Sequence, residues 1–153
     1  MQSTDLNLNM SIENMHANTP LSEDAARQYS PLALAFLGDS VYEVMVREQL
    51  LREANRPSKQ LHEAAVAHVR AAYQADAAER IAPLLTETET DMLRRGRNAS
   101  GASVPKSASP AVYRLATGFE CLFGYLYLSG QTARLAELFA VIWRGAASEQ
   151  HEG

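Results

Sequence analysis

The chain has 153 residues, of which 46% are hydrophobic and 21% are charged, so we expect one globular domain with a core of its own. Its single cysteine, Cys121, excludes an internal disulfide, and neither a secretory signal nor an apolar run of about 18 residues is present, so we expect a cytoplasmic protein with no membrane contact. The formal net charge of -4 argues against a nucleic-acid binder unless the positive charges are segregated.

The first third of the chain predicts a tail followed by two helices. Residues 1–21 are polar and rich in Asn, so we expect a disordered or loosely attached tail. Ser22 then precedes a short helix. Ser30 followed by Pro31 is an N-cap and first-turn signal, which predicts a long helix that ends near Glu53.

The remainder of the chain predicts helices separated by prolines, glycines and capping residues. Apolar spacing and stop signals predict these helices at 58–80, 86–95, 110–129 and 132–147. Thr86 with Glu89 three residues later is a capping box. Because no stretch alternates apolar and polar residues for long, we expect an all-α domain over residues 22–147, with a C-terminal tail at 148–153.

Two of these predicted helices each carry an acidic residue in an apolar run. Asp39 lies in LALAFLGDSVYEVMV and Glu120 lies in ATGFECLFGYLYL. Arg47 is eight residues after Asp39 and Arg114 is six residues before Glu120, which is not the spacing of helical neighbours. Since an unpaired carboxylate is costly to bury, we expect the two helices to pack together and the two acids to share a divalent metal ion.

Each of these acids also has a purely structural interpretation. Asp39 would be a helix-interior acid whose carboxylate is satisfied by a core tyrosine or by a backbone group at a kink near Gly38. Glu120 would be an outward-facing acid on a helix whose other faces are apolar. The residues alone leave both alternatives open.

The positive charges are concentrated in one segment. Residues 92–119 contain no Asp or Glu but include five basic residues: Arg94, Arg95, Arg97, Lys106 and Arg114. The middle of the segment, NASGASVPKSASP, is irregular, so we expect a flexible basic loop that contacts phosphates beside the metal site. The alternative is a solvated loop whose arginines complement a helix C-terminus.

These motifs carry a family resemblance. LALAFLGDSVYEV resembles the signature helix of ribonuclease III catalytic domains, in which an acid follows Phe-Leu-Gly. RGRNASGASVPKSASPAVYRLATGFECLFGYLYL is similar to the second half of Mini-ribonuclease III, the short bacterial form that consists of the catalytic domain alone. The match runs from about Pro31 to Trp143. It implies a helical bundle with the ribonuclease III endonuclease fold. It also implies a homodimer that cleaves double-stranded RNA with Mg²⁺, or with Mn²⁺ as a substitute, to 5′-phosphate and 3′-hydroxyl ends.

The resemblance also implies roles for individual residues. Asp39 and Glu120 take the positions of the essential catalytic metal ligands. Longer ribonuclease III enzymes have three further acids, where this chain has Leu32, Ala35 and Thr117, so we expect a metal shell completed by water and RNA. Thr117 is then a candidate to hydrogen-bond a bound water.

The same resemblance implies RNA contacts from the basic segment. The residues suited to phosphate oxygens and 2′-hydroxyls are Arg94, Arg95, Arg97, Asn98 and Lys106. His62 and His68 lie on the helix predicted at 58–80, and a lone His at helical spacing is typically packed or exposed rather than catalytic. The proposed mechanism needs no His.

A dimer is expected because the two strands of duplex RNA are related by a two-fold axis, and a two-fold dimer presents one site to each strand. The signature helix has apolar residues on more than one face, which suits both a core and a partner subunit, although a buried central helix of a monomer is the alternative. The resemblance implies maturation of the large-subunit (23S) ribosomal RNA precursor, with a large-subunit ribosomal protein as a partner. No room is left for a separate double-stranded-RNA-binding domain, so we expect weak, salt-sensitive binding.

Two rival classes stay open. An all-α, metal-dependent nucleotide pyrophosphohydrolase would also use helical carboxylates, but it needs several acids at Glu-x-x-Glu spacing on one helix. The segment TETETD is interpreted as an exposed capping sequence instead. A non-catalytic double-stranded-RNA-binding dimer would use the same fold without its acids, and both acids are present.

Overall fold

The computed structural model describes residues 17–99 and 109–152, with side chains to residue 146. Its helices are α2 (Glu23–Arg27), α3 (Pro31–Glu53), α4 (Ser58–Val69), α5 (Ala71–Ile81), the 3₁₀ helix η1 (Ala82–Leu84), α6 (Glu87–Ala99), α7 (Pro110–Leu128) and α8 (Thr132–Glu152). No strand occurs within the described ranges, so the all-α prediction is confirmed. None of the helices in those ranges is long and apolar enough to cross a membrane.

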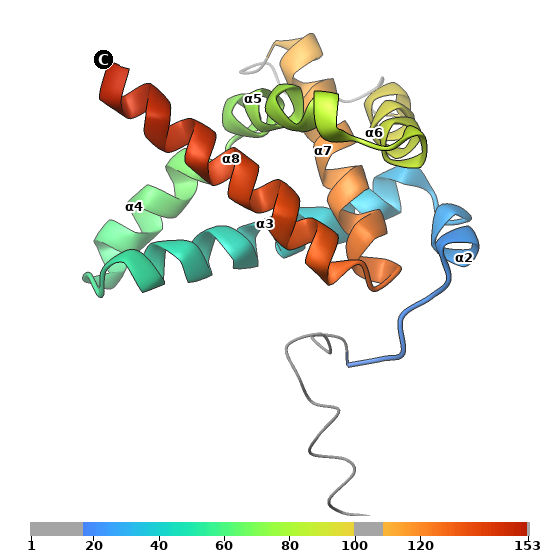
Figure 1. The fold of residues 1–153 in the computed structure, drawn as a ribbon, viewed down its shortest axis with the longest axis horizontal. Helices are drawn as coiled ribbons and strands as arrows, with labels where there is room; N and C mark the ends of the chain where they lie inside the picture. Colours follow the sequence, from blue (N-terminus) through green and yellow to red (C-terminus); the bar gives the residue numbers. More distant parts are fainter. Residues whose placement is uncertain (1–16, 100–108, 153) are drawn as a thin grey trace, which may run out of the picture.

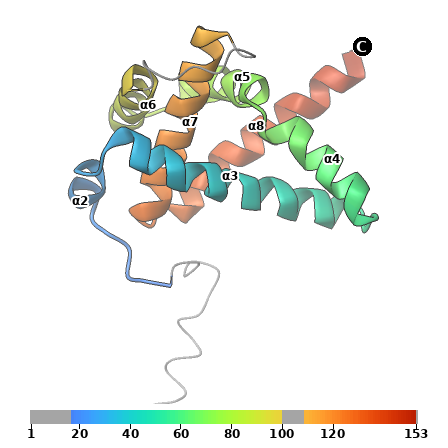
Figure 2. The ribbon, with the colours of Figure 1, turned by 180° about the vertical axis from the view of Figure 1, so that it is seen from behind.

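Helix α7 is the centre of the bundle. It packs against α2, α3, α5, α6 and α8. Every residue from Ala116 to Leu126 is buried except Glu120, as expected for a helix that is apolar on all faces. Helix α8 crosses the front of the molecule in Figure 1, and α3 lies in front when the molecule is seen from behind in Figure 2.

The predicted helix starts are confirmed where side chains cap them. The hydroxyl of Ser30 accepts a hydrogen bond of 3.1 Å from the backbone N–H of Ala33, at the start of α3. At the start of α6, Glu89 accepts from the N–H of Thr86 at 2.9 Å, and Thr86 accepts from the N–H of Glu89 at 3.2 Å. This reciprocal pair is the expected capping box.

The helix predicted at 58–80 is wrong as one continuous element, because it breaks at Arg70. Arg70 is extended, with ψ of 156°, and separates α4 from α5. The hydroxyl of Tyr42 donates to the carbonyl oxygen of His68 at 2.8 Å, and the amide of Gln74 donates to that of Val69 at 2.9 Å. These side chains satisfy carbonyl groups that a continuous helix would pair internally, so the break needs neither Gly nor Pro.

Two other helices are longer than predicted. Helix α6 continues past Arg95 to Ala99, and α8 continues past Ala147 to Glu152. Neither extension contains a proline, and the residues are compatible with helix. The extension of α6 places Arg97 and Asn98 on a helix rather than in a loop.

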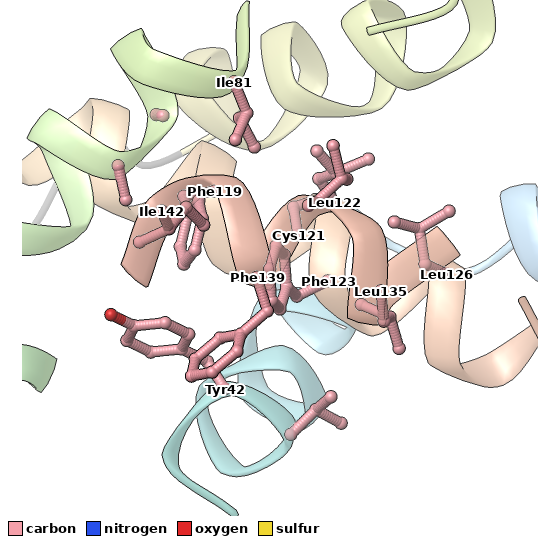
Figure 3. Packing of buried hydrophobic residues seen from close by; sticks show 14 of the residues in the cluster. Tyr42, Ile81, Phe119, Cys121, Leu122, Phe123, Leu126, Leu135, Phe139 and Ile142 are labelled. Atoms are coloured by element: carbon pink, nitrogen blue, oxygen red, sulfur yellow. The ribbon is translucent and has the colours of Figure 1, made fainter. Parts of the chain in front are cut away.

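An aromatic cluster fixes α3 against α7. The ring of Tyr42 meets those of Phe119 and Phe123 edge to face, with centroid separations of 5.0 and 5.8 Å (Figure 3). Phe139 of α8 lies 6.3 Å from Tyr42. Tyr42 and Phe119 are fully buried, and such pairs contribute about 0.5–1.5 kcal/mol each beyond their burial. Phe119 directly precedes Glu120, so this packing also positions the predicted site.

A buried ion pair joins α6 to α8. Glu89 is 4% exposed, and both of its carboxylate oxygens accept hydrogen bonds of 2.9 Å from Arg134. Arg134 also donates to the carbonyl oxygen of Leu84 at 2.8 Å. The expectation that residues 86–91 are simply exposed is therefore wrong for Glu89, which needs its arginine partner to be buried.

Candidate active site

Helices α3 and α7 touch through their backbones at two glycines. A Cβ atom on Gly38 would lie 1.7 Å from the carbonyl oxygen of Glu120, and one on Gly124 would lie 1.9 Å from the carbonyl oxygen of Leu34. Only residues without a side chain allow the helices to come this close. Because Asp39 directly follows Gly38, the crossing brings Asp39 to Glu120.

The two predicted metal ligands therefore lie together, in different environments. Asp39 is exposed and Glu120 is half-buried, so the expectation that both carboxylates are buried among apolar side chains is wrong for Asp39. Burial, followed by the negative charge of Asp39 and a hydrogen bond with it, raises the pKa of Glu120 to about 8. The site is thus a pair of coupled carboxylates at the edge of the core.

This pair fits a hard divalent cation. Carboxylate oxygens are the ligands that Mg²⁺ prefers, and a cation between them would relieve the repulsion that raises the pKa of Glu120. Within residues 17–99 and 109–146, no ion pair joins either carboxylate to a Lys or Arg. The same described residues contain no group of three or more His, Cys, Asp or Glu that could hold a metal. Within this part of the chain, Asp39 and Glu120 are therefore a pair of carboxylates rather than part of a larger ligand cluster.

The three positions at which longer ribonuclease III enzymes have further acids differ in how exposed they are. Leu32 is 51% exposed, whereas Ala35 is packed in the core. Thr117 is buried, and its hydroxyl donates to the carbonyl oxygen of Tyr113 at 3.1 Å. That bond uses the single hydrogen of the hydroxyl, so Thr117 can meet a water only by accepting a hydrogen bond from it. Its contact with a bound water stays a prediction.

A second glycine contact brings α6, whose second half carries Arg94, Arg95 and Arg97, onto α7. A Cβ atom on Gly96 would lie 2.5 Å from Cβ of Cys121, and one on Gly118 would lie 2.5 Å from the carbonyl oxygen of Leu93. Cys121 is the residue after Glu120. Close packing at glycines therefore holds α6 beside the carboxylate pair, as it also holds α3 against α7.

The predicted RNA-binding residues are not equivalent. Arg94 is exposed and pairs with Asp91, one turn earlier on α6. Arg97 and Asn98 are exposed near the end of α6. Arg95 is half-buried, and its guanidinium donates to the carbonyl oxygen of Arg27 at 3.1 Å. Lys106 lies outside the described residues.

The two histidines, His62 and His68, belong to α4 and are not among the contacts described for the carboxylate pair. His68 stacks on Trp143 with a centroid separation of 4.7 Å, and its Nδ1 is 2.7 Å from the carbonyl oxygen of Ala64. His62 is exposed on α4. The contacts of His68 are those of a packed side chain.

Sequence reasoning missed the four glycines that create the site. Gly38, Gly96, Gly118 and Gly124 lie inside helices, where glycine weakens the helix by about 1 kcal/mol relative to alanine. A glycine inside a helical pattern is itself a signal of close packing, and this signal was available in FLGDS, RGRN, TGFE and LFGY.

Comparison with known proteins agrees with this architecture. Residues 32–131 match the model of the ribonuclease III domain. Mini-ribonuclease 3 of Symbiobacterium thermophilum is 52% identical over 108 residues, which cover 71% of this chain and 83% of the relative. Mini-ribonuclease 3 of a Thermoanaerobacter species is 43% identical over 118 residues, covering 77% and 83%. A crystal structure of a Fusobacterium nucleatum protein superposes with a TM-score of 0.72 at 28% identity, covering 78% of this chain and 96% of that one.

The helical fold and the matched domain define the class of protein, an endoribonuclease with a ribonuclease III domain. The sequence identity of 52% and 43% to two relatives, over most of both chains, narrows the class of protein further. The chain belongs to the ribonuclease III family, in its Mini-ribonuclease 3 group.

Proposed function

We propose that this endoribonuclease cleaves double-stranded RNA with Mg²⁺, or with Mn²⁺ as a substitute, and leaves 5′-phosphate and 3′-hydroxyl ends. The observation that supports the proposal most directly is the meeting of Asp39 and Glu120 at the glycine crossing of α3 and α7. Two coupled carboxylates at the surface are suited to hold one cation against a phosphodiester. We also propose that the protein works in the cytoplasm.

In this mechanism Asp39 and Glu120 bind and orient the cation, and Glu120 must lose its proton to do so. When bound, the cation supplies positive charge that neutralises phosphate oxygens and acidifies water. The crossing of α3 and α7 fixes both carboxylates before substrate arrives, so little reorganisation accompanies binding. The exposed side of Asp39 leaves room for RNA and water to complete the shell.

Substrate contact is proposed for Arg94, Arg97 and Asn98 on α6 and for Lys106 after it. The three described side chains are exposed on the helix that packs beside Cys121. Their donors suit phosphate oxygens and the 2′-hydroxyls of the wide minor groove of A-form RNA. Since these charges sit on an otherwise acidic chain, binding should fall steeply as salt rises.

We propose a homodimer in which two α3 helices meet. Helix α3 exposes a row of large apolar side chains, with Leu32, Phe36 and Val44 exposed by 51%, 83% and 53%. Val44 also lines an apolar groove of about 580 Å³ between α3 and α8, whose other lining residues include Val41, Met45, Leu135, Phe139 and Trp143. The exposed ring of Phe36 in one copy and the apolar groove of another could complement each other across a two-fold axis. The exposed Asp39 shares this helix, so the dimer would carry two sites close together.

From the family resemblance alone, we further propose that the natural substrate is the duplex formed by the two ends of the 23S ribosomal RNA precursor. A large-subunit ribosomal protein would present that duplex to the enzyme. A cleavage assay on precursor duplex, with and without the large-subunit ribosomal proteins, tests both statements. Equal cleavage of random duplex under all conditions would contradict them.

The proposed activity is tested with a long perfect duplex RNA and Mg²⁺. Wild type should cut the duplex to products whose 5′ ends accept a kinase label only after phosphatase treatment. Asp39→Asn and Glu120→Gln should lose cleavage by at least about 100-fold. Glu43→Gln is the matched control, because Glu43 lies on α3 one turn from Asp39 but pairs with Arg47.

The outcomes separate the rival classes. Intact RNA together with hydrolysis of a nucleoside triphosphate would replace the proposal with a nucleotide pyrophosphohydrolase. Tight binding of duplex without cleavage at any metal concentration would replace it with a non-catalytic binding dimer. If Asp39→Asn and Glu120→Gln cut as fast as Glu43→Gln, the assignment of the site is wrong.

A further inference from the structure

The side chain of Arg95 spans from α6 to the junction between α2 and α3. Its Nη1 donates to the carbonyl oxygen of Arg27 at 3.1 Å, and its Nη2 lies 3.5 Å from the carbonyl oxygen of Tyr29. Arg27 is the last residue of α2, and Tyr29 directly precedes Ser30, the N-cap of α3. One side chain therefore contacts the backbone at the end of α2 and just before the N-cap of α3.

These acceptors suit a guanidinium for a physical reason. The last carbonyl groups of a helix have no partner within it, so side-chain donors often satisfy them. A guanidinium holds five N–H donors in a fixed planar fork that can span two separate carbonyl groups, whereas a lysine carries its three donors on one compact nitrogen at the end of a flexible stem. The bond to the carbonyl oxygen of Arg27 is partly buried, whereas the contact with that of Tyr29 is exposed.

The contacts of Arg95 connect α6 to the start of α3, and both helices contribute residues to the proposed active site. The residue after Arg95 is Gly96, which packs against Cys121 beside Glu120. The helix that starts after Tyr29 carries Asp39. The remaining α6 cations proposed for RNA, Arg94 and Arg97, lie on either side of Arg95 in the sequence.

We propose that Arg95 is a positioning residue for RNA cleavage rather than a phosphate ligand. It holds the RNA-facing side of α6 in a fixed position relative to the start of α3, so that the cations of α6 and the carboxylates of the site meet the same duplex. This inference rests on the proposed function, and it changes the role that the sequence resemblance suggests for Arg95. Loss of the anchor lets α6 shift, and a shift of about 1 Å can lower a catalytic rate by up to about 100-fold.

The test compares Arg95→Gln, Arg95→Lys and the matched control Arg94→Gln in the full chain. Arg94 is the neighbouring exposed arginine, and its described partner is Asp91 of the same helix. Binding to duplex RNA is measured over a range of salt concentrations with a chelator present, so that the RNA stays intact. Cleavage with Mg²⁺ gives kcat and KM, and hydrogen exchange of the backbone around Tyr29 reports the anchor without RNA.

A positioning role predicts that Arg95→Gln and Arg95→Lys behave alike. Both should lower kcat by about 10-fold or more. Both should speed amide exchange around Tyr29 and leave the slope of log affinity against log salt as in wild type. Arg94→Gln should instead reduce that slope by about 1, the amount that one phosphate contact contributes, with unchanged exchange.

Other results overturn the inference. If Arg95→Lys resembles wild type while Arg95→Gln reduces the salt slope by about 1, Arg95 is a phosphate contact. Unchanged exchange and unchanged kcat in both variants would exclude any anchoring role. If Arg95→Gln does not fold, Arg95→Lys carries the test, since it keeps the charge. A wild type that binds no duplex RNA refutes the proposed function, whereas exchange around Tyr29 still decides whether the anchor exists.

Discussion

Replacing Gly38 with alanine should separate the two carboxylates of the site without unfolding the protein. The new Cβ atom would lie 1.7 Å from the carbonyl oxygen of Glu120 and 2.7 Å from the backbone nitrogen of Gly124. Both contacts are backbone atoms, which cannot rotate away as the end of a side chain can. Ordinary contact begins at 3.4 Å, so the two helices must move apart by about 1.7 Å at this point.

The expected effect on stability is small compared with the effect on activity. Overpacking of this kind lowers the free energy of unfolding by about 1–3 kcal/mol, and the better helix propensity of alanine offsets about 1 kcal/mol of it. A domain with about 5–15 kcal/mol of stability stays folded after such a loss. Because Asp39 follows Gly38 directly, its distance from Glu120 grows, and we expect cleavage to fall by about 100-fold.

The assay combines calorimetric titration with Mg²⁺, cleavage of duplex RNA and thermal unfolding. Gly145→Ala is the matched control, because the three atoms nearest to its Cβ would all belong to the side chain of Arg80, at 3.0–3.2 Å, and that flexible chain can shift. Gly124→Ala should repeat the loss, since its Cβ would lie 1.9 Å from the carbonyl oxygen of Leu34. The reasoning is refuted if Gly38→Ala binds Mg²⁺ and cuts RNA as well as Gly145→Ala does.

Three further predictions concern charge, ion pairing and assembly. Glu120→Gln should raise the free energy of unfolding of the metal-free protein by about 1–3 kcal/mol at pH 9, but by much less at pH 5, as measured by urea titration. Arg134→Met should lower that free energy by about 3 kcal/mol, because it leaves the Glu89 carboxylate buried without its cation. If the proposed dimer forms, Phe36→Glu should convert it to a monomer in sedimentation experiments, whereas Leu84→Glu, at an exposed leucine of η1 outside α3, should not.

The sign of the pH effect follows from the raised pKa of Glu120. Between its ordinary value of 4.5 and about 8, the folded protein binds more protons than the unfolded chain. The stability contributed by the protonated carboxyl is therefore present at low pH and is lost as pH rises through about 8. A stability difference that does not grow from pH 5 to pH 9 would contradict this.

For Arg134, the control is Glu137→Gln, which removes its exposed partner and should change stability by less than about 1 kcal/mol.

The helix boundaries show where sequence reasoning works. Ser30 and the Thr86–Glu89 pair predicted helix starts that the structure confirms, because capping joins residues only three apart and depends little on the rest of the fold. The break at Arg70 was not predictable in this way. It depends on the hydroxyl of Tyr42, which comes from another helix and lies 26 residues away from His68 in the sequence.

The same distinction between local signals and tertiary contacts applies to the candidate site. Asp39 and Glu120 are recognisable as unusual residues in apolar runs, and the family resemblance placed them in one site. The difference between an exposed Asp39 and a half-buried Glu120 was not predictable, because helix periodicity does not tell which neighbouring helix covers which face. The partners of Arg95 and Glu89 are likewise set by tertiary contacts, the latter with Arg134 across 45 residues of sequence.

The sequence by itself determined the all-α class, most helix starts, the two acids and the family, since each depends on local spacing or on a continuous motif. Only the tertiary structure decided that Gly38 and Gly124 let α3 and α7 touch, that Asp39 is open to solvent and that Arg95 is tied to the backbone before α3. The physical reason is that these features depend on which surfaces pack together, and packing joins residues whose separation in sequence carries no signal of their contact.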